Sequence, residues 1–177
     1  MNSSSDPKRA LNRRNFLKTV ALGGSASFLS LTLGSRAALG AGKTDVLLLS
    51  CMDYRLVDYT LHYMVGRGLR DKYNHVVLAG ASLGAITDKY PEWNKTFWDH
   101  LSLAIKLHSI RCVMVLDHRD CGAYKLILGE DCCNTLEKET RAHRTQLQGL
   151  EEEIRKRYSN LEVELLLMNL NGVVEKI

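Results

Sequence analysis

The feature that most constrains the fold is a repeated alternation between short, uninterrupted apolar runs and longer amphipathic stretches. Apolar runs without polar alternation are typical of strands that are covered on both faces, as in parallel sheets. These runs lie within 45–49, 76–80 and 110–116, and the more polar segment 161–170 is the last predicted strand. Between them lie three stretches in which apolar side chains recur at three- and four-residue steps, the spacing of an amphipathic helix. These stretches are 55–73, 91–108 and 134–158. The pattern predicts an α/β fold, with a mostly parallel sheet of four to five strands and helices on both faces.

Composition and charge exclude several other classes of protein. With 45% hydrophobic and 25% charged residues, the chain has the composition of a globular protein rather than a disordered or collagen-like one. Its net charge of +4 is concentrated in residues 1–37, which hold six Lys and Arg against Asp6 alone and so carry +5. The remainder of the chain is at −1. We therefore expect no nucleic-acid partner.

The basic N-terminal segment has the pattern of an export signal. Arg13 and Arg14 precede an uncharged run over 20–33, which is shorter than the roughly 20 residues of a spanning helix and is followed by small residues. The arginine pair resembles the twin-arginine signal of bacteria. We interpret 1–41 as a twin-arginine-type signal peptide that directs the protein through the twin-arginine export machinery to the periplasm, and 42–177 as a single domain. An uncleaved membrane tether and a buried N-terminal helix are the alternatives.

Two groups of chemically active side chains follow the first and third predicted strands. Cys51, Asp53 and Arg55 follow the first, and His118 and Cys121 follow the third. Because ligands collect at the carboxyl ends of parallel strands, we expect the two groups to meet at one edge of the sheet. Two thiols and one imidazole suit zinc, although Co²⁺ or Fe²⁺ would accept the same ligands. The sequence therefore predicts a metal site with three protein ligands, whose fourth position is open or filled by a carboxylate.

The two motifs together resemble the signature of the β-class carbonic anhydrases. The motifs are Cys-x-Asp-x-Arg at 51–55 and His-x-x-Cys-Gly at 118–122. The segment 76–84, with its Ala-Gly pair, is similar to the strand that lines the pocket in that family. The resemblance extends from about residue 45 to the last predicted strand. It implies a β-carbonic anhydrase-like fold for the zinc-binding domain.

The resemblance also implies a reaction and a role for each residue. Zinc would be held by Cys51, His118 and Cys121, and a zinc-bound hydroxide would hydrate CO₂ reversibly to bicarbonate and a proton, because zinc lowers the pKa of bound water from about 15.7 to about 7. Asp53 would orient that water, and Arg55 would hold Asp53 ionised. In a closed state, Asp53 would itself be the fourth ligand. The enzyme would be a carbonic anhydrase, a zinc lyase.

Some positions depart from the pattern of the family. Asp117 stands where Gly is usual, and Leu78 where a polar residue is common. We expect Asp117 to lie behind the metal ligands or to bond a backbone amide, and Gly80 of the pocket segment to lie behind the ligands as well. Few residues of the predicted domain precede its first strand, where members of the family carry helices that embrace a partner subunit. A homodimer is therefore a hypothesis only.

Two other functions remain open from the sequence. The same scaffold could hydrolyse a sulfur analogue such as carbonyl sulfide or carbon disulfide. A non-catalytic periplasmic zinc-binding protein is the other alternative, and the adjacent Cys132 and Cys133 could then serve redox or metal chemistry, although loose packing on an exposed turn is favoured for this pair.

The candidate site residues also have structural interpretations. Cys51 and Cys121 could form a disulfide in an oxidising periplasm. His118 could be a buried core histidine, and Asp53 with Arg55 could be a simple ion pair. The remaining histidines and Cys112 are expected to be structural.

Overall fold

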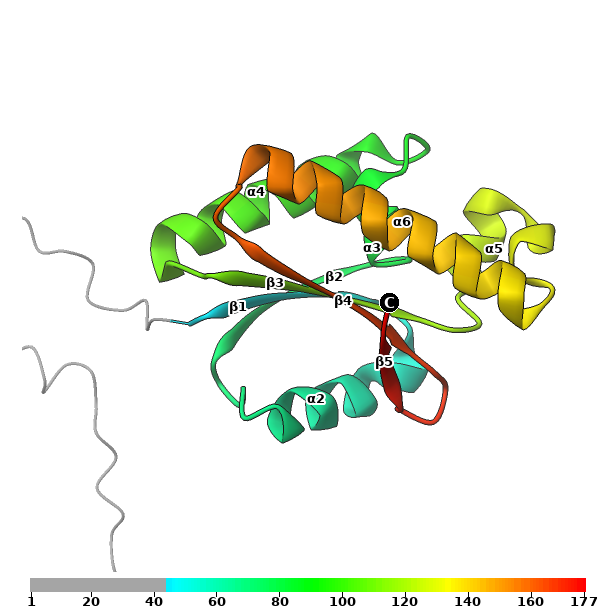
Figure 1. The fold of residues 1–177 in the computed structure, drawn as a ribbon, viewed down its shortest axis with the longest axis horizontal. Coiled ribbons are helices and arrows are strands. Elements are labelled where there is room, and N and C mark those ends of the chain that lie inside the picture. The colour runs from blue at the N-terminus through cyan, green and yellow to red at the C-terminus, as the bar shows by residue number, and fades with distance from the viewer. Residues whose placement is uncertain (1–43) are drawn as a thin grey trace, which may run out of the picture. The chain divides into compact units, whose positions relative to one another are not determined.

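The computed structural model describes residues 44–177, so the predicted signal peptide lies outside the described part of the chain. This part forms a five-stranded sheet with helices on both faces (Figure 1). The strands are β1 (Val46–Cys51), β2 (Tyr73–Leu78), β3 (Cys112–His118), β4 (Glu162–Met168) and β5 (Val174–Lys176). Their order is β2-β1-β3-β4-β5; the first four are parallel, and β5 is antiparallel to β4. The predicted α/β class is confirmed.

Helices cover the two faces of the sheet unequally. Helix α2 (Val57–Gly66) lies on one face, and α3 (Ser82–Ile86), α4 (Pro91–His108) and α6 (Leu136–Arg157) lie on the other (Figure 1). Helix α5 (Gly122–Leu128) follows β3, and short 3₁₀ helices span Tyr54–Leu56 and Glu130–Cys133. No helix within 44–177 is long and apolar enough to cross a membrane.

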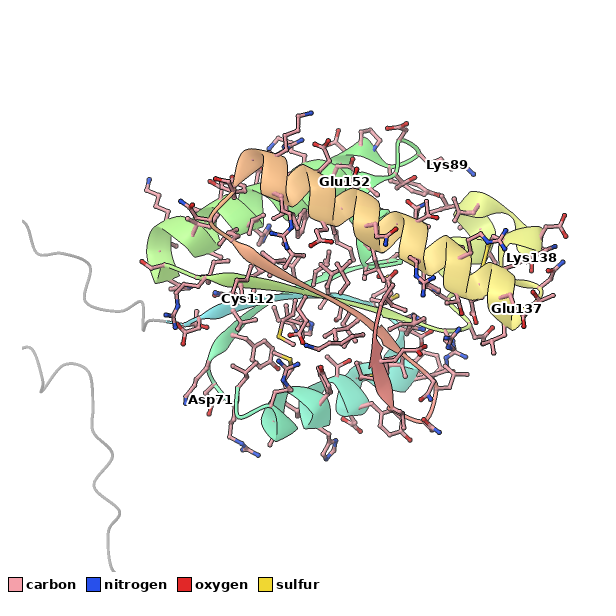
Figure 2. The ribbon with its side chains drawn as sticks, in the orientation of Figure 1. Asp71, Lys89, Cys112, Glu137, Lys138 and Glu152 are labelled. Atoms are coloured by element: carbon pink, nitrogen blue, oxygen red, sulfur yellow. A yellow bond between two sulfur atoms is a disulfide. The ribbon has the colours of Figure 1, made fainter. Side chains whose placement is uncertain are left out.

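Local sequence explains where the long helices begin and end. Helix α4 begins with Pro91, whose fixed φ suits the first helical turn. Helix α6 begins after Thr135, whose side chain accepts a hydrogen bond from the Lys138 amide, and acidic residues in its first turn and basic residues in its last turn complement the helix dipole. Glu137 and Lys138 mark this exposed first turn in Figure 2.

The core lies on both faces of the sheet, because alternate residues of each buried strand point to opposite sides. On the side of α4 and α6, Leu49 and Val115 pack in one cluster with Phe97 and Leu147. On the side of α2, Leu48 and Met114 pack with Met64. Burial on both faces is what uninterrupted apolar runs require.

The structure corrects several predicted boundaries. The helix expected over 55–73 begins at Val57, after a 3₁₀ turn, and ends at Gly66. The second strand begins at Tyr73 and ends at Leu78, before a turn in which Gly80 has a φ of 75°. Three short elements, α3, α5 and β5, were not predicted, because they contain 5, 7 and 3 residues and so show little periodicity.

Candidate metal centre

Three potential metal ligands converge where β1 and β3 end. Cys51 is the last residue of β1, His118 is the last residue of β3, and Cys121 precedes the first turn of α5. Strands β1 and β3 are parallel neighbours, so their carboxyl ends meet. One ligand atom from each of the three residues lies within 4.8 Å of the other two, and the two sulfurs are 3.9 Å apart. The structure thus brings together the three residues predicted as ligands.

The imidazole of His118 is arranged as a metal ligand would be. Its Nδ1 lies 2.9 Å from the Arg119 carbonyl oxygen and donates to it, while its buried Nε2 has no hydrogen-bond partner. A buried polar atom without a partner is costly, and ligating histidines commonly donate their other ring N–H to a backbone carbonyl. Nε2 together with two sulfurs is a donor set that suits zinc. The residues present therefore fit the metal that the sequence predicts.

Both cysteines of the cluster are free, so the alternative of a disulfide between them is wrong for this structure. A hydrogen bond from Cys121 lowers the pKa of Cys51 to about 4, and His118 and the Gly80 amide add to this effect. The same hydrogen bond and burial raise the pKa of Cys121. In the absence of metal, Cys51 is therefore the thiolate of the two cysteines and Cys121 is the thiol.

Asp53 lies beside the ligand cluster and is held there by Arg55. Arg55 Nε donates to Asp53 Oδ1 at 3.0 Å and Nη2 donates to Oδ2 at 2.7 Å, and the Arg55 amide also donates to Oδ1 at 3.0 Å. Asp53 Oδ2 is 3.9 Å from His118 Nε2. The bonds from the Arg55 side chain lower the pKa of Asp53 to about 2. Asp53 is therefore ionised at neutral pH and stands next to the metal ligands.

Arg55 also joins the two loops that carry the site. Its Nη1 donates to Asp120 Oδ2 at 2.9 Å, and its Nη2 donates to the Asp120 carbonyl at 3.0 Å. Asp120 has a φ of 56°, a conformation uncommon outside glycine, and its amide donates to Glu139 on α6 at 2.6 Å. Lys125 holds its other carboxylate oxygen at 2.5 Å. Asp120 is thus fixed from three sides.

Sequence reasoning missed Asp120 and Glu139. Asp120 lies within the second motif, between its two predicted ligands. Its charge at this position could have marked it as a candidate site residue. Glu139 lies on another helix, and nothing in the sequence indicates that its carboxylate reaches this loop.

Gly80 and Asp117, which were predicted to support the metal ligands, both lie next to them in the structure. The amide of Gly80 donates to Cys51 Sγ at 3.3 Å. A Cβ on residue 80 would approach Ala123 Cβ to 3.3 Å, which favours glycine at this close approach. Asp117 is buried and accepts a hydrogen bond from the Ser82 amide at 3.0 Å.

Comparison with known proteins identifies the family. A family model described as "Putative carbonic anhydrase" matches residues 41–177. The chain belongs to this family. Its relatives include an uncharacterized protein of Rickettsia conorii, 44% identical over 135 residues that cover 76% of this chain and 73% of that protein. An uncharacterized protein of Rickettsia bellii is 42% identical over 135 residues, which cover 76% of this chain and 82% of the other.

Solved structures show the same fold. The carbonic anhydrase from Glaciozyma antarctica is similar with a TM-score of 0.51 and 14% identity, covering 96% of each chain. A tetrameric β-carbonic anhydrase from Sordaria macrospora has a TM-score of 0.51 and 14% identity, covering 77% of this chain and 81% of the other. The resemblance to the β-class carbonic anhydrases in family and fold is therefore confirmed.

Several other cysteines and histidines of the protein lie outside the ligand cluster. Cys132 and Cys133 form a disulfide in the 3₁₀ helix before α6, so the prediction of loose packing was wrong. Cys112 is half-buried at the start of β3, far along the strand from His118, and burial raises its pKa to about 11 (Figure 2). His143 is fully buried and bonds Asp117.

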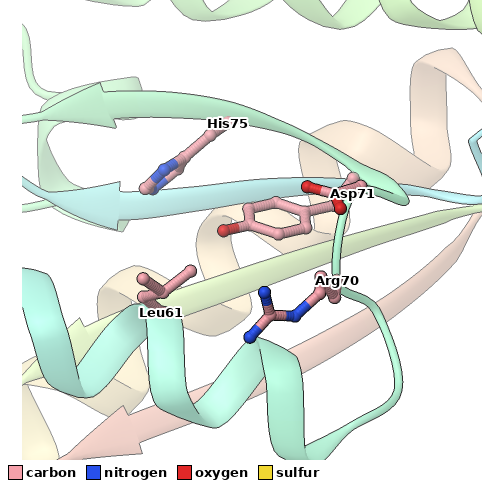
Figure 3. A pocket seen from close by; sticks show the side chains of 5 residues that line it. Leu61, Arg70, Asp71 and His75 are labelled. Atoms are coloured by element: carbon pink, nitrogen blue, oxygen red, sulfur yellow. The ribbon is translucent and has the colours of Figure 1, made fainter.

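The cavities of the protein differ in their relation to the cluster. A cavity of about 340 Å³ opens beside α2 and β2 and is lined by Leu61, Arg70, Asp71, Tyr73 and His75 (Figure 3). It contains none of the predicted ligands, and the Nε2 of its histidine lies 2.7 Å from Ser50 Oγ. A cavity of about 10 Å³ borders Cys51 and His118 directly. Of these two cavities, the smaller one is in contact with predicted metal ligands.

Proposed function

We propose that the protein is a carbonic anhydrase that hydrates CO₂ reversibly to bicarbonate and a proton, with zinc held by Cys51, His118 and Cys121. The observation that carries the proposal is the position of Asp53. This ionised carboxylate is clamped by Arg55, and its Oδ2 lies 3.9 Å from the unpartnered Nε2 of His118. Membership of the family and the β-carbonic anhydrase fold support the same reaction.

The metal and the surrounding residues would divide the chemistry between them. Zinc, when bound, supplies a Lewis acid that lowers the pKa of water to about 7. Asp53, as a carboxylate, can only accept hydrogen bonds, so it would orient a water molecule by accepting a hydrogen bond from it. Arg55 keeps this acceptor ionised and fixed in direction, because two parallel hydrogen bonds hold both carboxylate oxygens.

The same clamp favours an open site over one closed by Asp53. To become a ligand, Asp53 would have to move toward the metal and so distort its hydrogen bonds to Arg55. Arg55 is itself held by Asp120 through two further bonds, so it cannot easily follow the carboxylate. The fourth position is then left to water and substrate rather than to Asp53.

Stopped-flow measurement of CO₂ hydration, with zinc content determined on the same sample, tests this proposal. Asp53→Asn should retain zinc and lose about 10- to 100-fold of the hydration rate, the usual effect of removing a hydrogen-bonding group that orients a metal site. Asp58→Asn is the matched control, because Asp58 is exposed on α2 and makes no side-chain bond within the described chain. It should leave the rate unchanged.

Other results of these measurements would change the proposed substrate or the proposed reaction. If the protein binds zinc but hydrates CO₂ no faster than buffer, the proposed substrate is wrong. Release of sulfide from carbonyl sulfide or carbon disulfide would then identify a hydrolase of sulfur analogues. Zinc without either activity would indicate a non-catalytic zinc-binding protein.

We also propose export to the periplasm through the twin-arginine-type signal over 1–41. Arg13→Lys together with Arg14→Lys should keep the protein in the cytoplasm, as measured by cell fractionation. Export of this double variant at the normal level would contradict the proposal. The hypothesis of a homodimer is tested separately by the mass of the purified protein in solution.

A further inference from the structure

A buried polar network lies beneath the metal centre. Its members are Asp117, Ser82, Tyr124 and His143, and none of them is more than 1% exposed. Asp117 accepts four hydrogen bonds: from the Ser82 amide at 3.0 Å, Ser82 Oγ at 2.7 Å, Tyr124 Oη at 2.5 Å and His143 Nδ1 at 2.9 Å. A buried carboxylate requires donors of this kind, because burying an unpaired charge is expensive. The network is therefore built around Asp117.

The four residues belong to four different elements. Asp117 is in β3, Ser82 begins α3, Tyr124 is in α5 and His143 is in α6. A single carboxylate thus fixes the end of one strand against three helices. A buried hydrogen-bonded network of this type restricts the movement of the elements that it joins.

Each metal ligand is connected to this carboxylate by a short path. Asp117 directly precedes His118, and Tyr124 lies in the first turn of α5, three residues after Cys121. The third path runs through Ser82 to the Gly80 amide, which donates to Cys51 Sγ at 3.3 Å. The network therefore reaches all three ligands without containing any of them.

The path to Cys51 passes through a strained turn. Ala81 has φ 40° and ψ −100°, a conformation that residues with a side chain rarely adopt. Such a conformation persists only where the surrounding structure determines it. The two bonds from Ser82 to Asp117 hold the residue that follows Ala81, and so they hold the turn that aims the Gly80 amide at Cys51.

We propose that Asp117 is a positioning residue that pre-organises the three metal ligands before the metal binds. The proposal rests on the part of the proposed function that assigns zinc to Cys51, His118 and Cys121. It does not require that the substrate be CO₂. Residues that hold metal ligands in place typically contribute a factor of about 10 to 100 in metal affinity.

Zinc affinity of the full-length protein tests this role, measured by competition with a chromophoric chelator. Asp117→Asn keeps the shape of the side chain but replaces one acceptor oxygen by an NH₂ group, which would face donors. We expect zinc to bind about 10- to 100-fold more weakly. The sulfur-to-metal absorption bands of the Co²⁺ form should also shift, because the Cys51 sulfur loses its fixed direction.

Other variants separate positioning from general stability. Asp99→Asn on α4 is the matched control, because this exposed carboxylate bonds only Lys95 in the described chain; it should leave both readouts unchanged. Ser82→Ala and Tyr124→Phe each remove one donor to Asp117 and should weaken zinc binding less than Asp117→Asn does. Circular dichroism of the metal-free variants establishes that each is folded.

The outcomes distinguish this inference from the proposed function. A folded Asp117→Asn protein with unchanged zinc affinity and Co²⁺ spectrum would overturn the positioning role. If Asp117→Asn does not fold, unchanged affinity in both Ser82→Ala and Tyr124→Phe would overturn it instead. A wild-type protein that binds zinc tightly but does not hydrate CO₂ would refute the proposed reaction and leave the positioning role standing.

Discussion

Replacement of Arg55 by glutamine measures how strongly the clamp on Asp53 stabilises the site. The Arg55 side chain donates two hydrogen bonds to Asp53 and two to Asp120, over distances of 2.7 to 3.0 Å. Glutamine keeps some capacity to donate but loses the charge and the fork of parallel donors. The variant therefore removes the interaction that lowers the pKa of Asp53.

The size of the effect follows from that pKa. The pKa of Asp53 is lowered from 3.8 to about 2, and a difference of this size corresponds to about 2.5 kcal/mol at neutral pH. The side chain of Arg55 is 34% exposed, so solvent screening reduces the net contribution to about 1 kcal/mol. We expect Arg55→Gln to lower the free energy of unfolding of the metal-free protein by about this amount.

The stability that the Arg55–Asp53 interaction contributes depends on pH in a defined direction. Because the folded-state pKa of Asp53 lies below the unfolded value, the clamp stabilises the fold above about pH 4. This contribution is lost as the pH falls through 3.8 toward about 2. The difference in stability between wild type and Arg55→Gln should therefore be full at about pH 7 and shrink below about pH 4.

Urea-induced unfolding of the metal-free proteins, followed by circular dichroism at a series of pH values, measures this difference. Two results would refute the reasoning. One is equal stability of the two proteins at neutral pH. The other is a difference that persists undiminished in acid, since it could not then arise from an ionised Asp53.

Three further predictions concern the fold and the metal. Gly84→Ala should destabilise the protein by about 1 to 3 kcal/mol in a urea titration, because a Cβ at this position would collide with the Ala79 carbonyl oxygen. A stability equal to that of wild type would contradict this close contact. Phe97→Ala should cost about 3 to 5 kcal/mol, because this side chain is fully buried between α4 and the sheet, whereas exposed Leu107→Ala on the same helix should cost far less. Removal of zinc with a chelator should expose Cys51 and Cys121 to a thiol reagent, and equal labelling before and after chelation would argue against these two ligands.

The sequence was sufficient to predict the elements that have strong patterns. Strands β1 and β3 appear as mainly apolar runs, and α4 and α6 are long enough to show helical spacing. The meeting of Cys51 with His118 and Cys121 was expected because parallel strands place their carboxyl ends at one edge of the sheet, and the structure makes β1 and β3 direct neighbours. In these cases the local pattern and the final fold agree.

The remaining features depend on contacts that are distant in sequence. Asp117 could be recognised as unusual, but its partners come from α3, α5 and α6, and two of these helices are too short to predict. Glu139 holds the Asp120 amide across 19 residues of chain. Neither contact has a signature in spacing or composition, because both are created by helix packing.

The most direct test of the account is a titration of metal-free protein with zinc, with the CO₂ hydration rate recorded at each addition. The account predicts that the rate rises in proportion to bound zinc and reaches its maximum when the Cys51, His118 and Cys121 site is filled. It also predicts that Asp53→Asn binds zinc equally but stays slow. A rate that does not depend on bound zinc, or an Asp53→Asn variant as fast as wild type, would contradict the central claim.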